Sequence, residues 1–201
     1  MALITLPNAP AFKTSDWGLK TATAVSRSPF TGHEQVYNYD LALWYAVLTL
    51  PPMNRDQAAL WTSFFLKMRG RKNTFLVGDP DAKSTRGTAT SCTITASAAI
   101  GDTTVSVNIG AGKTLKEGDY IQFGGSASAK LYMITDNAAG DASGDVDITI
   151  EPPLKVAVTT STSAVIDQPK CVMRLDSNEL TWSANELSVY GMSFSCTEAL
   201  S

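Results

Sequence analysis

Apolar positions follow a helical period in one stretch of the chain, between Leu50 and Pro80. Four large apolar residues stand there at positions i, i+3, i+4 and i+7, which places them along one side of a helix. They are Trp61, Phe64, Phe65 and Met68. An aromatic stripe of this kind needs a surface to cover it. We expect it to pack into the core against a β-sheet, and the alternative is that it forms a groove for another protein.

The ends of this helix are marked by residues suited to capping. Asn54 occupies an N-cap position and Gln57 follows three residues later, as in a capping box. Gly70 suits the left-handed conformation that commonly ends a helix. The sequence therefore predicts a helix over residues 55–69.

The rest of the first 85 residues alternates between apolar and polar positions with the period of two that is typical of strands. Strands are expected at Leu3–Leu6, Trp17–Val25, Val36–Leu50 and Thr74–Val77. Within the third of these, Trp44, Ala46 and Leu48 alternate with Tyr45 and Val47. This period of two marks a strand with two different faces.

The composition changes between residues 86 and 167, where Thr, Ser, Ala, Gly and Asp dominate and neither Trp nor His occurs. Short alternating runs recur there between turn signals, which predicts a small β-barrel or sandwich. The runs are Ala89–Ala96, Thr103–Ile109, Tyr120–Phe123, Lys130–Thr135, Asp145–Ile150 and Val156–Ile166.

After Pro169 the composition of the first part returns, with expected strands at Cys171–Leu175 and Leu187–Thr197 and a hairpin-like stretch around Trp182. The sequence thus predicts a discontinuous β domain, residues 1–85 and 168–201, that carries the helix. A second β domain, residues 86–167, is inserted into it. The expected fold class is mainly β with one α-helix (α+β).

Composition excludes several classes of function. The net charge of −3 argues against bulk nucleic-acid binding, which needs a basic face. Cys92, Cys171 and Cys196 are widely spaced, with no CxxC pair, so we expect free buried thiols and no zinc site. No cofactor is expected. The absence of a signal peptide pattern and of a long apolar run predicts a soluble, non-membrane protein made in a cytoplasm.

Three motifs suggest chemistry and fail on inspection. Gly110–Thr114 resembles a phosphate loop, but Val107 stands where its first glycine belongs and a turn is expected instead. The loop Asp136–Asp147 fails the EF-hand register, which leaves other calcium loops open against an acidic hairpin tip. His33, the sole histidine, lies in an expected loop without an acid or nucleophile pattern, so no enzyme activity is predicted.

Arg69, Arg71 and Lys72 form a compact cluster of cations after the predicted helix. Two interpretations remain open for them. They either form a solvated helix end, where cations face the negative end of the helix dipole, or they make a contact between subunits.

Several short motifs follow one another in an order similar to that in distal tail proteins of long-tailed bacteriophages, which this chain resembles over most of its length. They are Trp17-Gly-Leu, Ser28-Pro-Phe-Thr-Gly32 with Gln35, Leu50-Pro-Pro-Met53, the capped helix with Arg69-Gly-Arg71, Thr74-Phe-Leu, Gly78-Asp-Pro80, Gly118-Asp-Tyr-Ile-Gln-Phe123, Glu151-Pro-Pro-Leu154 and an end in Glu198.

The resemblance implies a tail-tube-like β-sandwich, the belt domain, with one flanking helix and an additional β-barrel domain. It implies a hexameric ring at the distal end of the tail tube, within the virion. The implied partners are further copies of the chain, the tail tube protein, and the hub and fibre proteins. The resemblance carries over no catalytic or binding residues.

Two alternatives stay open. One is another tail component, such as a tube or terminator subunit. The other is a carbohydrate-binding module in residues 86–167, which would need exposed aromatic side chains. That segment offers Tyr120, Phe123 and Tyr132, of which at least two are expected to face inward.

Overall fold

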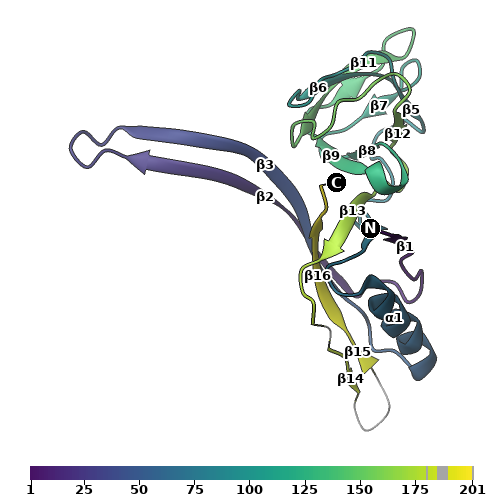
Figure 1. Cartoon of the computed structure of the whole chain (residues 1–201). Coiled ribbons are helices and arrows are strands. Elements are labelled where there is room, and N and C mark those ends of the chain that lie inside the picture. Colours follow the sequence, from purple (N-terminus) through teal and green to yellow (C-terminus); the bar gives the residue numbers. More distant parts are fainter. Residues whose placement is uncertain (180, 185–189, 201) are drawn as a thin grey trace.

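A computed structural model describes residues 1–179, 181–184 and 190–200 of the chain (Figure 1). The fold is mainly β, with 43% of residues in strands and, in the part described, a single α-helix. The expected mainly β fold with one helix is confirmed. A six-stranded sheet and a closed β-barrel make up most of the molecule.

The larger sheet has the strand order β1-β4-β13-β16-β3-β2. These strands are β1 (Leu3–Ile4), β4 (Thr74–Val77), β13 (Cys171–Leu175), β16 (Ser193–Glu198), β3 (Glu34–Thr49) and β2 (Thr14–Arg27). β1 runs parallel to β4, and all other neighbours are antiparallel. The sheet therefore joins both ends of the chain.

Helix α1 (Arg55–Met68) lies beside this sheet, as the periodicity predicts (Figure 1). Its capping box is formed: the side chain of Asn54 accepts from the backbone N–H of Gln57 at 2.9 Å, and the Gln57 side chain accepts from the N–H of Asn54 at 3.3 Å. The helix ends one residue early, because Arg69 already adopts the left-handed conformation expected of Gly70, with φ of 53°.

The aromatic stripe of α1 packs into the core, so the alternative of a groove for another protein is wrong. Each member is at most 4% exposed. Phe64 meets Phe75 of β4 edge to face at 5.5 Å, and Phe65 meets Phe194 of β16 in the same way at 5.2 Å. A helix, rather than a second large sheet, thus covers this face in the described part of the chain.

The barrel is closed, with the strand order β11-β6-β5-β12-β8-β9. These strands are β5 (Cys92–Ile94), β6 (Thr104–Asn108), β8 (Tyr120–Phe123), β9 (Lys130–Ile134), β11 (Asp145–Glu151) and β12 (Ser163–Val165). All of them fall within the predicted insert, residues 86–167. Closure leaves no free strand edge, which resolves the choice between barrel and sandwich in favour of the barrel.

Some predicted boundaries in the insert are wrong. Residues 156–162 form no named strand, and β12 occupies only the end of the expected Val156–Ile166 run. The short pair β7 (Thr114–Leu115) and β10 (Ala138–Ala139) was not expected. A one-turn 3-10 helix, η1 (Ser126–Ser128), connects β8 and β9. Two residues of strand are too short to give a periodic signal.

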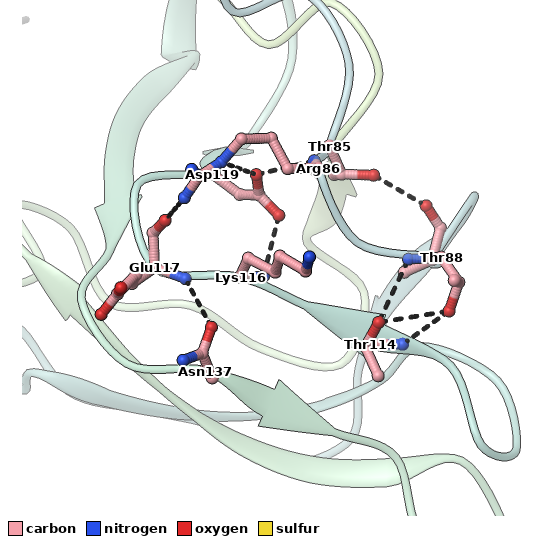
Figure 2. Close-up of polar contacts among 9 residues, drawn as sticks. Thr85, Arg86, Thr88, Thr114, Lys116, Glu117, Asp119 and Asn137 are labelled. Atoms are coloured by element: carbon pink, nitrogen blue, oxygen red, sulfur yellow. Dashed lines mark hydrogen bonds and ion pairs between the residues drawn. The ribbon is translucent and has the colours of Figure 1, made fainter.

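The chain enters the barrel through a small polar network (Figure 2). The buried carboxylate of Asp119 accepts from the backbone N–H groups of Arg86 at 2.8 Å and Lys116 at 2.9 Å. Thr88 and Thr114 exchange N–H to hydroxyl bonds at 3.2 and 3.0 Å. Gly87 directly precedes Thr88, and a Cβ atom on Gly87 would stand 2.0 Å from the carbonyl oxygen of Thr114. The backbones therefore cross too closely for any other residue.

Near the C-terminus, β14 (Ser183–Ala184) pairs with β15 (Tyr190–Gly191), in agreement with the predicted hairpin-like stretch. The predicted strand Leu187–Thr197 is represented by β15 and β16. Its first residues, 187–189, lie outside the described part of the chain.

Candidate assembly surfaces

β2 and β3 form a long hairpin whose outer half extends away from the rest of the molecule (Figure 1). β16 pairs with β3 only between Tyr45 and Thr49. Beyond that point β2 is the only strand among the described residues that pairs with β3, so no third described strand supports the hairpin. We call residues 20–43 the arm.

Every second residue of β3 from Tyr37 to Val47 is apolar, and we call this set the arm stripe. Its members are Tyr37, Tyr39, Leu41, Leu43, Tyr45 and Val47. All except the half-buried Leu43 are exposed, by 38% to 66%. Several large apolar side chains exposed on one strand are typical of a site of interaction with another protein.

The stripe begins over the body of the sheet, where the pairing of β2 with β3 is regular. Tyr45 lies opposite Gly18, and a Cβ atom on Gly18 would stand 2.7 Å from the tyrosine ring. The ring therefore lies flat across the glycine. A register shift follows between Thr21 and Thr23, and the irregular stretch of β3 opposite it contains Tyr39. Such irregularities bend a strand pair.

The tip of the arm carries a single large apolar side chain. Phe30 is 96% exposed, in a turn closed by a bond from the N–H of Ser28 to the carbonyl of His33 at 2.9 Å. Arg27 and Glu34 form an ion pair across the base of this turn. His33 is exposed in the turn, which confirms the prediction of a loop histidine facing solvent or an interface.

The structure brings the predicted cations Arg69, Arg71 and Lys72 together at the C-terminal end of α1, where all three are exposed. Lys67 joins them from the last turn of the helix. Lys67, Arg69 and Lys72 line a shallow hollow of about 500 Å³. Their placement agrees with both interpretations, a solvated helix end and a subunit contact.

The root of the arm is joined to the barrel through buried polar groups. The indole N–H of Trp44 donates to the carbonyl of Leu131 in β9 at 2.7 Å, and its backbone N–H donates to Glu198 at 3.2 Å. Glu198 also forms a buried ion pair with Lys155, which follows β11. Burial lowers the pKa of Lys155, while the Glu198 carboxylate opposes that shift. The sheet, barrel and arm thus meet at one carboxylate.

A second buried lysine lies at the same junction. The ammonium group of Lys130 donates to the carbonyl of Ala199 at 2.8 Å. Burial lowers the pKa of Lys130, and Glu198 nearby again opposes the shift. Sequence reasoning missed this junction, because partners 43 to 154 residues apart leave no local pattern.

The barrel presents no aromatic platform in residues 86–167, all of which the structure describes. Tyr120, Phe123 and Tyr132 are each at most 8% exposed. Gly110–Thr114 forms a turn with two left-handed glycines and leads into β7 rather than a helix, as predicted. These features give no support to sugar or nucleotide binding.

The acidic loop 136–147 uses a carboxylate to hold its own turn. Asp141 accepts from the N–H groups of Ser143 at 2.7 Å and Asp145 at 2.9 Å. These bonds, that from Asp145 foremost, lower the pKa of Asp141. No group of three or more metal-ligating side chains is found within the described residues. The loop is therefore an acidic hairpin tip in its present form.

The three cysteines are free and buried, as expected. Burial raises the pKa of Cys92 and of Cys196 to about 12, which suppresses the thiolate form. In the portion of the chain that is described, no helix has the length and apolar character needed to cross a membrane. No protein-family model matches the sequence, and no curated protein shows significant similarity to it.

Proposed function

We propose that this chain is a structural virion protein of a bacteriophage tail. In this proposal its copies form a ring, with six subunits expected, at the distal end of the tail tube. The observation that carries the proposal is the arm stripe, a row of exposed apolar side chains on a hairpin that extends away from the body. A protein that acts alone has no use for such a surface.

Physical considerations favour association between copies. An exposed apolar side chain gains about 25 cal/mol for each Å² that a partner removes from water. The arm of one copy has to meet a different surface on the next copy, and repeated contacts of this head-to-tail kind close into a ring when the rotation allows. Obligate interfaces in such assemblies commonly bury more than about 2,000 Å².

The location in the tail rests on the resemblance in sequence. A helix beside a six-stranded sheet, with a barrel between two of its strands, is compatible with a belt domain that carries an additional domain. The proposed partners are therefore other copies of the chain, the tail tube protein, and the hub and fibre proteins. Assembly would take place in the cytoplasm of the bacterial host.

A tube or terminator subunit remains the alternative, because such proteins also form rings. Antibody labelling of intact tails distinguishes these proposals by electron microscopy. Label confined to the tip end of the tail supports a distal ring. Label along the whole shaft indicates a tube subunit, and label at the head end indicates a terminator.

The arm is tested directly by replacing Tyr39 and Leu41 with serine and measuring the mass in solution by light scattering. We expect wild-type protein to assemble and the Tyr39→Ser/Leu41→Ser variant to remain monomeric. A matched control, Ile100→Ser/Val156→Ser, removes two exposed apolar side chains from the barrel and should assemble like wild type. A wild-type protein that stays monomeric at high concentration would contradict the proposal.

A further inference from the structure

Two charged surfaces of opposite sign lie on separate parts of the molecule. The first is the basic surface at the C-terminal end of α1, made of Lys67, Arg69, Arg71 and Lys72. The second is the acidic surface at the start of β11, made of Asp141, Asp145 and Asp147. Asp141 holds its own turn and the cations suit the end of a helix dipole, but the gathering of like charges on each surface exceeds what these local roles need.

The backbone beneath the basic surface is held in place. Arg69 ends the helix with its N–H bonded to the carbonyl of Leu66 at 3.2 Å. The side chain of the buried Asn73 donates to the carbonyl of Lys67 at 2.9 Å, and the N–H of Arg71 donates to Asn178 at 3.0 Å. Four cations thus project from a fixed backbone, and three of them, Lys67, Arg69 and Lys72, line the hollow described above. A backbone that is already fixed loses less conformational entropy on binding than a mobile one would.

The acidic surface is fixed in a similar manner. Asp145 and Asp147 project from the same face of β11. Asp145 accepts from the side chain of Asn108 at 2.8 Å, and Asp147 from the hydroxyl of Ser106 at 2.6 Å. Asp141 lies in the turn just before them. Residues 86–167 as a whole carry nine acidic and five basic residues, a net charge of −4.

Neither surface is neutralised within one chain. The ion pairs among the described residues join other side chains and include none of these seven. Figure 1 shows β11 at the outer end of the barrel, at the top of the view, and α1 at the lower end of the sheet, so the two surfaces lie at opposite ends of one molecule and do not meet within it. Between two molecules they can meet.

We propose that the basic surface of one copy receives the acidic surface of the barrel of a second copy. Because the two patches differ, the contact is head-to-tail and repeats from copy to copy, as a ring requires. It is separate from the contact made by the arm stripe. This inference rests on the proposed self-assembly and adds a second, charge-selective interface to it. Complementary charges of this kind set orientation and speed up encounter.

Charge reversal tests the inference on the full chain. Arg69→Glu/Lys72→Glu makes the helix end acidic, and Asp145→Lys/Asp147→Lys makes the barrel surface basic. We expect each variant to raise the dissociation constant for self-association, measured by sedimentation, by about tenfold or more. An equimolar mixture of the two variants should recover association to within about threefold of wild type, because each altered surface then finds its complement on the other variant.

The control Lys83→Glu/Lys170→Glu changes the net charge by as much as Arg69→Glu/Lys72→Glu does. It alters two exposed lysines in the segments that connect the sheet and the barrel. It should associate like wild type. Circular dichroism on every variant checks that the fold is intact. Wild-type association should weaken as salt is raised from about 0.1 M to 1 M, over which the screening length falls from about 10 Å to about 3 Å.

Several outcomes overturn the inference and leave the proposed function standing. One is reversed variants that associate like wild type, and another is a mixture that recovers nothing, which would mean that the two surfaces do not meet. A wild-type protein that is monomeric at every salt and protein concentration overturns both proposals together.

Discussion

The stripe on α1 and the stripe on the arm look alike in the sequence and differ in the structure. Both repeat large apolar residues with the period of their element. The four residues of the helix stripe are at most 4% exposed, whereas five of the six on the arm are exposed by 38% to 66%. Periodicity thus reports that a face will be covered and does not say by what.

The difference follows from what lies opposite each stripe. α1 lies against β4 and β16, which supply Phe75 and Phe194 as partners. The arm continues past the end of β16 (Figure 1), and at Tyr45 and Val47, where β16 still pairs with β3, no described element covers the outward face of the sheet, since both side chains are exposed. The helix stripe is therefore buried by residues of its own chain, whereas the arm stripe can be buried only by another molecule.

The largest expected effect comes from breaking the helix stripe. Phe64→Ala should lower the free energy of unfolding by about 3–5 kcal/mol, because it leaves a cavity beside Phe75 and Trp61. Urea denaturation measures this. As a control on the same helix, Leu66→Ala removes a side chain that is 67% exposed and should change stability by less than about 0.5 kcal/mol. Equal losses from both would contradict the assignment of the stripe to the core.

The next effect concerns the root of the arm, where the arm strand passes into the core at Trp44. Glu198→Gln leaves Lys155 buried without its counter-charge, so we expect a loss of about 3 kcal/mol. The double variant Glu198→Gln/Lys155→Met removes both charges and should regain part of that loss. Equal instability of the single and double variants would contradict the assignment of the loss to the unpaired charge of Lys155.

The elements flanked by clear capping or turn residues were those whose bounds the sequence predicted well. The helix agrees to within one residue, since its stripe and its capping residues, Asn54 and Gln57, point to the same limits. β4, β8 and β13 also match their predicted bounds. Local sequence signals suffice to predict the bounds of an element when the residues that begin and end it lie next to it in the sequence.

The sequence could not reveal how far the arm extends. The sequence predicted two strands and a turn, and it showed that β3 has two different faces. The end of β16 at Glu198 decides which part of β3 lacks a second partner strand. The position of that end depends on tertiary structure, because β16 pairs with residues of β3 that lie about 150 positions away in the sequence. The candidate cations were found because three of them are neighbours in sequence. The acidic loop 136–147 was also found from the sequence, but the side chains that hold Asp145 and Asp147, Asn108 and Ser106, come from another strand and could not be predicted.

Substitutions in the arm are expected to have the smallest effect on the stability of the isolated chain. They therefore distinguish the role of the arm stripe from that of the helix stripe. Tyr37→Ser/Tyr39→Ser should change the unfolding free energy by less than about 0.5 kcal/mol in dilute solution, because both side chains are already in water. Association stabilises a folded chain by mass action, so the wild-type melting temperature should rise with protein concentration. The arm variant should lose that dependence, whereas Phe64→Ala should melt lower and still keep it. An arm variant whose melting temperature rises with concentration as steeply as that of wild type would show that the stripe is not where the copies meet.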